Sequence, residues 1–454
     1  MLKTLKCGQR AYCRIQKSLI QRRTFLSEAY RCEEAWKDRF KFPLLRNVKP
    51  ENLFIDLDHK QSTTGKISAI DIDIFANTVK EQFQIEELLT LVHNLRLTAE
   101  TSNTLESTHH AVIRYLLDID CTEDLINVLH DRLNYGIFPD YLCYNILMDT
   151  YIKRKDYATA AKIAVLPMLQ EDSGNPITNA LCVYCCHKHL ESPEKWQKPE
   201  VPVDDSKEEI KVRVSYLRNP YFDDHFDLTD PRDLVGKTLA FYGKFMNNTL
   251  GRTCQLRGLI LYKKYDDISK LIEQWLKEVK DNVVYEEVLD LIKKDNESLS
   301  EEQVTDEFKN VMSQVEKLRA VNLCKDSLIE ALENEVKSAV DKQSEIDISE
   351  QLQKYIHWGE VREIVLQDQL KEIERQKSIE NLTVLKKALE DEEKLITFFE
   401  NEEKIELEIE KIEKREQDEM DRVLKMHKAE KKLKKLEKEE EYIPPTIAKQ
   451  KLNF

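Results

Sequence analysis

The most reactive group of side chains in the sequence is a cluster of cysteines and histidines within residues 182–189. Cys182, Cys185 and Cys186 follow the i, i+3, i+4 spacing that places side chains on one face of a helix. Thiolates and imidazoles so arranged could bind zinc, but a structural zinc site needs four converging ligands. No second CxxC or HxxxH pattern completes the set. We therefore expect core packing here, with no metal and no other cofactor.

Patterns for catalysis are equally sparse. Asp71 and Asp73 are two residues apart, which directs their carboxylates to different faces of a helix and excludes an acid–base pair. The sequence contains no GxSxG motif, no HExxH motif and no glycine-rich loop for phosphate. The sequence therefore predicts neither an enzyme nor a small-molecule substrate.

Two basic clusters could instead hold the phosphates of a nucleic acid. Lys153, Arg154 and Lys155 are consecutive, and the second cluster lies within residues 231–264 beside a single acid, Asp233. The second cluster consists of Arg232, Lys237, Lys244, Arg252, Arg257, Lys263 and Lys264. Phosphate contacts supply affinity without reading a base sequence. The alternative for both clusters is an ordinary solvated surface.

Helices must position these side chains. Only 9 of the 454 residues are Gly and 12 are Pro, and this scarcity disfavours the tight turns of sandwiches and barrels. Apolar residues recur with a helical period in segments that follow one another at a spacing of about 33–37 residues per pair, which indicates a helical-repeat solenoid. We predict helices at 67–79, 85–97, around 112–117, 125–133, 141–152, 157–169, 177–190, 234–246, 253–262, 268–279 and 283–292.

The amino-terminal segment differs from the rest of the chain in charge. The whole chain has a net charge of −15, yet residues 1–27 contain seven Lys and Arg and no acid. A basic, acid-poor and amphipathic segment is typical of a mitochondrial transit peptide, so we expect import into the matrix. A basic arm that is not cleaved is the alternative. No apolar run reaches the length of about 18 residues that a membrane span requires.

Residues 123–172 carry a family resemblance. The motif GIFPD at 136–140, followed by the aromatic–Asn pair at 144–145, resembles the junction between two pentatricopeptide repeats. Ala158, Ala160 and Ala161 match the small residues that let the two helices of such a repeat approach. The run YGIFPDYLCYNILMDTYIKRKDYATA and the segment FLSEAYR at 25–31 also resemble the family of small-subunit protein twenty-seven, the pentatricopeptide-repeat protein of the animal mitochondrial small ribosomal subunit.

The resemblance implies which residues meet RNA. In pentatricopeptide proteins the first helices line a groove, and positions five and last hydrogen-bond the base edges of single-stranded RNA. With Tyr141 as the first position, Asn145 is fifth and Asn175 last, and His110 and Asp140 are equivalent one repeat earlier. Amides and carboxylates suit such pairing because they offer donors and acceptors to exposed base edges. The alternative for Asn145 is a buried structural amide.

The last third of the chain is charged and helical. Residues 301–440 hold 26 Lys and Arg against 38 Asp and Glu. An apolar 4-3 spacing predicts a heptad seam at Val304, Phe308, Val311, Val315 and Leu318. A polar stretch at 341–349 predicts a break that would allow a helical hairpin. Beyond residue 383 the apolar register is interrupted by carboxylates, so a coiled coil and a single exposed helix both remain open.

The expected architecture is all-α, a pentatricopeptide-type helical-repeat solenoid followed by a long charged helical or coiled-coil region. The expected divisions are a transit peptide at 1–27, the helical-repeat domain at 28–300, the charged region at 301–440 and a tail at 441–454. The resemblance implies a structural, RNA-binding component of the mitochondrial small ribosomal subunit that supports translation. Its partners would be small-subunit rRNA and neighbouring ribosomal proteins. Two alternatives are a mitochondrial coiled-coil scaffold without RNA and a free regulator that binds mRNA or tRNA.

Overall fold

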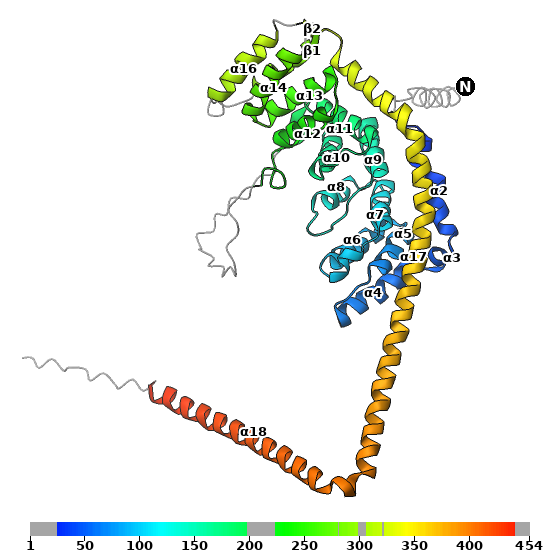
Figure 1. The fold of residues 1–454 in the computed structure, drawn as a ribbon, viewed down its shortest axis with the longest axis vertical. Helices are drawn as coiled ribbons and strands as arrows, with labels where there is room; N and C mark the ends of the chain where they lie inside the picture. The colour runs from blue at the N-terminus through cyan, green and yellow to red at the C-terminus, as the bar shows by residue number, and fades with distance from the viewer. Residues whose placement is uncertain (1–24, 198–222, 280, 298–305, 320–321, 441–454) are drawn as a thin grey trace, which may run out of the picture. The chain divides into compact units, whose positions relative to one another are not determined.

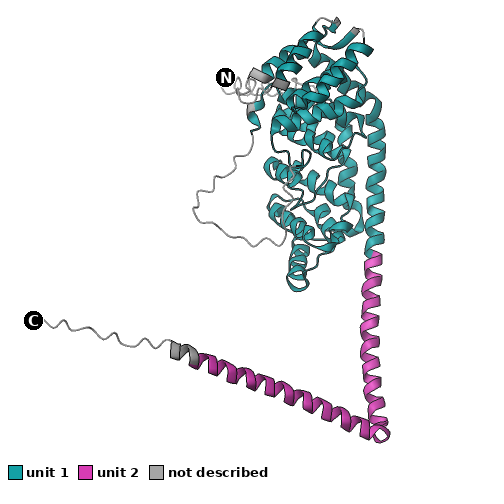
Figure 2. Cartoon of the chain, turned by 60° about the vertical axis from the view of Figure 1, so that its left-hand side comes forward, with its two compact units in different colours: residues 1–366 teal, residues 367–454 magenta. Residues whose placement is uncertain are grey.

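Helices dominate the computed structural model of the chain (Figure 1), which confirms the all-α class. Two compact units are present, residues 1–366 and residues 367–454 (Figure 2). The predicted transit peptide lies almost wholly, and the tail at 441–454 wholly, outside the described residues. The described residues are 25–197, 223–279, 281–297, 306–319 and 322–440.

The amino-terminal half of the first unit is built of short helices that pair in sequence order. Five elements precede the predicted repeats: η1 (Glu28–Arg31), α2 (Glu33–Asp38), η2 (Arg39–Lys41), α3 (Pro43–Asn47) and α4 (Pro50–Thr64). The helices that follow match the predicted segments: α5 (Ala69–Thr78), α6 (Ile85–Arg96), α7 (Glu106–Asp118), α8 (Thr122–His130), α9 (Tyr141–Arg154), α10 (Tyr157–Leu169) and α11 (Pro176–His189). The apolar period therefore located each of these helices correctly.

These helices form two rows. Neighbouring helices α5, α7, α9 and α11 contact one another and constitute the inner row, with α8 and α10 packed behind them. Side-chain caps fix where three helices begin: Asp140, Asp156 and Asn175 accept hydrogen bonds from the first free backbone N–H groups of α9, α10 and α11. Ala160 and Ala161 are fully buried between the rows. The starts of α9 and α11 in the inner row, and of α10 behind them, are thus fixed by side-chain caps.

The second half of the first unit continues the helical packing and adds two short strands. Strands β1 and β2 pair in parallel, and the sequence predicted neither of them. The apolar residues predicted as a heptad seam, Phe308 to Leu318, pack against α14 and α15 within one core. The elements are α12 (Pro231–Phe245), α13 (Thr249–Leu261), α14 (Tyr265–Glu278), β1 (Asp281–Tyr285), α15 (Glu286–Glu297), α16 (Asp306–Leu318) and β2 (Asn322–Cys324).

The long helix α17 (Leu328–Ile396) corrects one prediction. The polar stretch at 341–349 does not break the chain, because α17 continues through it without interruption, so the predicted hairpin is wrong. Leu328, Leu332 and Val336 at the start of α17 belong to the main core of the first unit. The residues of α17 up to 366 therefore belong to the same compact unit as the inner row.

The second unit is helical and carries no buried side chain between residues 367 and 435. It contains the remainder of α17 and helix α18 (Phe398–Glu440), whose regular geometry is interrupted at Asn401. Its charged side chains form i,i+3 and i,i+4 pairs such as Lys371 with Asp368. Within the part of the chain that the structure describes, no helix is long and apolar enough to cross a bilayer.

Candidate nucleic-acid interface

The four residues expected to meet RNA bases gather on the inner row. His110 lies within α7, Asp140 caps α9, Asn145 lies within α9 and Asn175 caps α11. Helix α17 runs along the same side of the unit (Figure 1). Three of these side chains are almost fully buried, with exposed fractions of 1% for His110, 0% for Asn145 and 4% for Asn175. Each of the four is hydrogen-bonded to other residues of the chain.

Both ends of the Asn145 amide have partners. Its Nδ2 donates to the hydroxyl of Tyr30 at 2.8 Å, and its Oδ1 accepts from Thr178 Oγ1 at 2.8 Å. Burial, reinforced by the neighbouring Asp347 carboxylate, raises the pKa of Tyr30, so this phenol stays neutral. The groups that would pair with a base are therefore already used, in agreement with the alternative of a buried structural amide.

Asn175 joins the inner row to α17. Its Oδ1 accepts from the backbone N–H groups of Ile177 and Thr178, which starts α11. Its Nδ2 donates to the carboxylate of Asp347 on α17 at 3.0 Å. Tyr30 donates to the same carboxylate at 2.6 Å. One acid of α17 thus binds both the amino-terminal segment and the cap of α11.

His110 and Asp140 form a second junction with α17. The Nδ1 of His110 lies 2.9 Å from Asp140 Oδ2, and its Nε2 lies 3.0 Å from the hydroxyl of Tyr355 on α17. Burial lowers the pKa of His110, although Asp140 opposes that shift. Burial alone would raise the pKa of Asp140, but the hydrogen bonds from His110 and Cys143 outweigh it and leave this pKa below its ordinary value. A neutral imidazole that donates to a charged carboxylate satisfies both groups.

The metal-ligating side chains of this region are accounted for by hydrogen bonds and packing. His110, Asp140 and Cys143 offer donor atoms within 4.8 Å of one another. The Nδ1 of His110 already contacts both the Asp140 carboxylate and the Cys143 thiol, and the backbone N–H of Cys143 donates to Asp140. A structural zinc site takes four ligands. The thiols of Cys182, Cys185 and Cys186 are fully buried, as predicted for core cysteines, and burial raises their pKa values. Such thiols behave as small apolar groups.

The first basic cluster lies at the end of α9. Lys153 forms ion pairs with Asp149 at 2.9 Å and with Glu28 at 3.6 Å. Arg154 pairs with Asp120 while its side chain stays 38% exposed. Lys155 is exposed and takes a left-handed conformation with φ of 60° as it ends the helix. Arg154 and Lys155 therefore face solvent, and Lys153 is engaged inside the unit.

The second basic cluster does not form a single surface. Arg257 is 3% exposed and forms a two-point ion pair with Asp295. Arg252 donates to the backbone oxygens of Asn282 and Val283, which holds β1 against α13.

Of the five remaining cations of this cluster, Lys263 and Lys264 form ion pairs with Asp233 at 3.2 Å and with Asp224 at 2.8 Å. The other three differ in exposure. Lys237 is half-buried and donates to the backbone oxygen of Asp224, and Arg232 is half-buried with a pKa lowered by burial. Lys244 is exposed in the last turn of α12. Only Lys244 among them combines full exposure with a place at the end of a helix.

The residues of α17 that engage the inner row were not predicted from the sequence. Tyr355 meets His110 across 245 positions of the chain, and Arg362 meets Asp73 across 289. No local period or motif can report contacts at such separation. The one available signal was the polarity of 341–349, because a helix that remains continuous can place polar side chains against buried polar partners.

The sequence matches one established family along most of its length. The family model of mitochondrial 28S ribosomal protein S27 covers residues 1–388. That range includes the whole first unit, with the inner row, both basic clusters and the first part of α17. The chain therefore belongs to the S27 family of mitochondrial small-subunit ribosomal proteins.

Proposed function

We propose that the chain is a structural component of the mitochondrial small ribosomal subunit that acts in the matrix, binds small-subunit rRNA and contacts neighbouring ribosomal proteins, and so supports mitochondrial translation. The observation that carries this proposal is the family match over residues 1–388. Ribosomal proteins are not an enzyme class, and the buried hydrogen-bonded clusters on the inner row suit a structural role. The composition of the first 27 residues supports import into the matrix.

The contact with rRNA uses phosphates and shape in preference to base edges. Asn145, Asn175, His110 and Asp140 bond to other residues of the chain, so base reading at these positions would require α17 to leave the inner row. Exposed ion pairs are worth only about 0–1 kcal/mol, so Arg154 can exchange Asp120 for a phosphate at little cost. Together with Lys155, it forms a small accessible cationic site.

Sedimentation tests the ribosomal assignment and the phosphate contacts together. We expect the wild-type protein to co-sediment with the small subunit in a sucrose gradient of matrix extract. Reversing Arg154, Lys155 and Lys244 to Glu should shift it toward free protein, most clearly at low salt, because phosphate contacts depend on released counterions and rising salt weakens them in the wild type as well. The matched control reverses three exposed lysines elsewhere, Lys270, Lys371 and Lys386.

Two results would contradict these statements separately. If the wild-type protein does not co-sediment with the small subunit, the proposal that it is a component of that subunit is refuted. If the triple-reversal variant co-sediments with the small subunit to the same extent as the control variant, these three cations do not contact phosphates of the rRNA.

The second unit favours contacts with proteins. Ile409, Ile412, Val423, Met426 and Leu433 share one register on α18, and each is between 49% and 64% exposed. An apolar stripe that one helix leaves exposed can be covered by a second helix. Removal of residues 367–454 leaves the first unit with its whole core, so this truncation tests the second unit alone. If the truncation abolishes co-sedimentation and the charge reversals do not, the alternative of a scaffold without RNA is favoured.

A further inference from the structure

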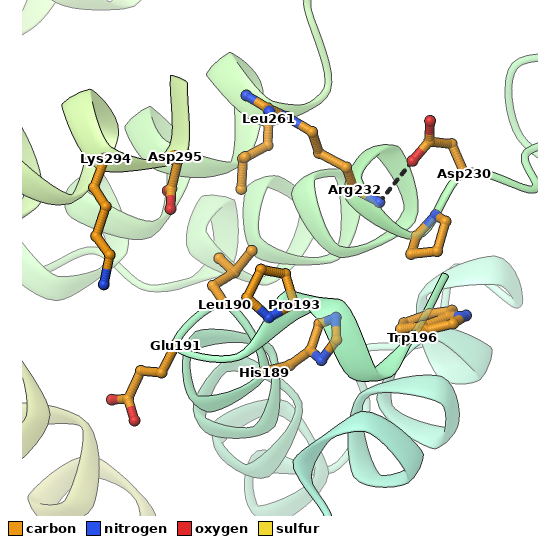
Figure 3. A pocket seen from close by; sticks show the side chains of 11 residues that line it. His189, Leu190, Glu191, Pro193, Trp196, Asp230, Arg232, Leu261, Lys294 and Asp295 are labelled. Atoms are coloured by element: carbon orange, nitrogen blue, oxygen red, sulfur yellow. Dashed lines mark hydrogen bonds between the residues drawn. The ribbon is translucent and has the colours of Figure 1, made fainter. Parts of the chain in front are cut away.

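A pocket of about 340 Å³ lies where α11, α12, α13 and α15 meet. Figure 3 shows His189 between Pro193 and Trp196 on one side, with Arg232 on the other. Small-molecule sites in proteins range from about 300 to 1,000 Å³, so this volume suits a single small ring system. The inner row and the two solvent-facing cations of the first basic cluster are not among the residues that line it.

Trp196 gives the pocket an accessible aromatic surface. The chain has four tryptophans, and Trp36, Trp275 and Trp358 are 3%, 6% and 8% exposed. Trp196 is half-buried, and its ring centre lies 5.4 Å from that of His189. Aromatic side chains of this kind serve as stacking surfaces for unpaired bases. Trp196 is therefore the tryptophan best placed to stack on a ligand.

His189 contributes a polar group that its surroundings leave unused. It is 3% exposed, and its Nδ1 has no hydrogen-bond partner among the residues that the structure describes. Burial, with a contribution from Lys162, lowers the pKa of His189 to about 4, so the ring is neutral at pH 7. A buried polar atom without a partner is costly. A ligand with a complementary ring edge would supply the missing hydrogen bond.

Charged side chains of both signs line the pocket. Its cations are Arg232 and Lys294, and its acids are Glu191, Asp230 and Asp295. Glu191 forms an ion pair with Lys188 at 2.9 Å. Asp230 caps α12 by accepting from the backbone of Arg232 at 2.9 Å, and Asp295 accepts both hydrogen bonds of the Arg257 guanidinium. The pocket thus combines an aromatic surface, a ring-edge hydrogen-bonding group and two cations.

We propose that this pocket binds one unpaired nucleotide of RNA, with its base against Trp196 and within hydrogen-bonding reach of His189 Nδ1, and its phosphate near Arg232 and Lys294. Unpaired bases are the part of RNA that proteins take out of the helix and stack on aromatic rings. The inference rests on the proposed binding of rRNA and specifies one place where it occurs. Stacking of one base depends little on which base it is, so we expect the pocket to hold the RNA in place without selecting a sequence.

Titration of the full-length protein with a single-stranded RNA heptamer tests the pocket. We expect RNA to quench the tryptophan emission of the wild type and of Trp275→Phe, but not that of Trp196→Phe. Trp196→Ala should weaken binding roughly tenfold, since one stacking contact of about 1.4 kcal/mol corresponds to that factor. Trp196→Phe should retain most of the affinity because a phenyl ring still stacks.

His189→Leu supplies a readout that a purely structural role would not give. Leucine removes the unpartnered Nδ1, so the melting temperature at pH 7 should stay the same or rise while RNA affinity falls. If His189→Leu instead lowers the melting temperature and leaves RNA affinity unchanged, His189 is a packing residue and the proposal is overturned.

The remaining outcomes separate the pocket from the wider function. If Trp196→Ala binds the heptamer as tightly as the wild type does, the pocket is not the site of RNA binding, although the proposal that the protein binds rRNA would stand. Equal affinity for adenosine monophosphate and for the heptamer would identify a free nucleotide as the ligand and overturn the RNA assignment of the pocket. Absence of any RNA binding by the wild type, together with absence from the small-subunit peak, would refute the proposed function itself.

Discussion

At the scale of single residues, buried polar side chains hold α17 on the inner row. Asp73 is fully buried and accepts hydrogen bonds from Ser107, Thr108 and Asn77 as well as from the guanidinium of Arg362 at 2.6 Å. Removing one partner of such a pair leaves a buried charge uncompensated, which costs far more than the pair itself contributes. Asp73, dismissed from the sequence as a catalytic group, is therefore a structural anchor.

Arg362→Met should destabilise the first unit by about 3–5 kcal/mol, because the buried Asp73 carboxylate loses the cation with which it pairs. Urea unfolding followed by circular dichroism measures this loss. Arg375→Met is the matched control on the exposed part of α17, where Arg375 pairs with Glu372 at the surface and about 0–1 kcal/mol is expected. Equal midpoints for the two variants would refute the anchoring role of Asp73.

Buried histidines make the first unit sensitive to acid. Burial lowers the pKa of His110 and His187, and that of His189 to about 4. An unfolded histidine has a pKa of about 6.5, so below that pH the unfolded chain binds more protons than the folded one. The contribution of these neutral histidines to the free energy of unfolding is therefore fully present above pH 6.5 and is lost as the pH drops toward 4.

The expected result is a melting temperature that falls between pH 7.5 and pH 5. His189→Leu should show a smaller fall over the same range, because one of the contributing imidazoles is gone. His427→Leu, in the exposed helix α18, should follow the wild type. A His189→Leu curve that parallels the wild type at every pH would show that His189 does not contribute.

At the scale of elements, the sequence predicted where helices lie better than what they touch. The period of Phe308, Val311, Val315 and Leu318 correctly indicated one apolar face, but that face packs on α14 of the same chain instead of a second copy. A period shows that a face is buried and carries no information on its partner. The polarity of residues 341–349 predicts a break in the helix for a related reason. Polar residues there do not end the helix, because Asp347 accepts hydrogen bonds from Tyr30 and Asn175.

The packing of α12 on α13 depends on four glycines that the sequence did not mark as important. Gly236 and Gly243 on α12 face Gly251 and Gly258 on α13, and the two glycines of each helix are seven positions apart. A Cβ at position 258 would lie 2.5 Å from the backbone N of Ala240 and from the O of Gly236. The two backbones can approach this closely only where side chains are absent.

Gly258→Ala should therefore separate the two helices and destabilise the first unit by about 1–3 kcal/mol or more, the usual cost of overpacking. Gly65→Ala is the control, because a Cβ there meets no atom within 4 Å and the strain of its left-handed backbone, about 1 kcal/mol, is the only expected cost. Differential scanning calorimetry compares the two. A Gly258→Ala protein as stable as Gly65→Ala would contradict the close packing of α12 on α13.

At the scale of the whole molecule, the chain combines a densely packed helical unit with a second unit in which the described side chains up to residue 435 are not buried. The resemblance predicted that the inner row would face RNA, but it could not show that α17 occupies that side, because the contacting residues are far apart in sequence. The many cations of residues 231–264 likewise suggested a larger basic surface than the structure has. Two of these cations pair with Asp224 and Asp295, which lie outside that stretch of sequence. We therefore place rRNA outside the inner row.

Ultraviolet cross-linking of RNA to protein in isolated mitochondrial small subunits, followed by identification of the cross-linked peptides, tests this claim most directly. We expect rRNA adducts on peptides that contain Lys155, Lys244 or Trp196, and none at Asn145 or Asn175. Adducts at Asn145 or Asn175, with none at the three exposed positions, would show that α17 leaves the inner row on the ribosome and that RNA takes its place.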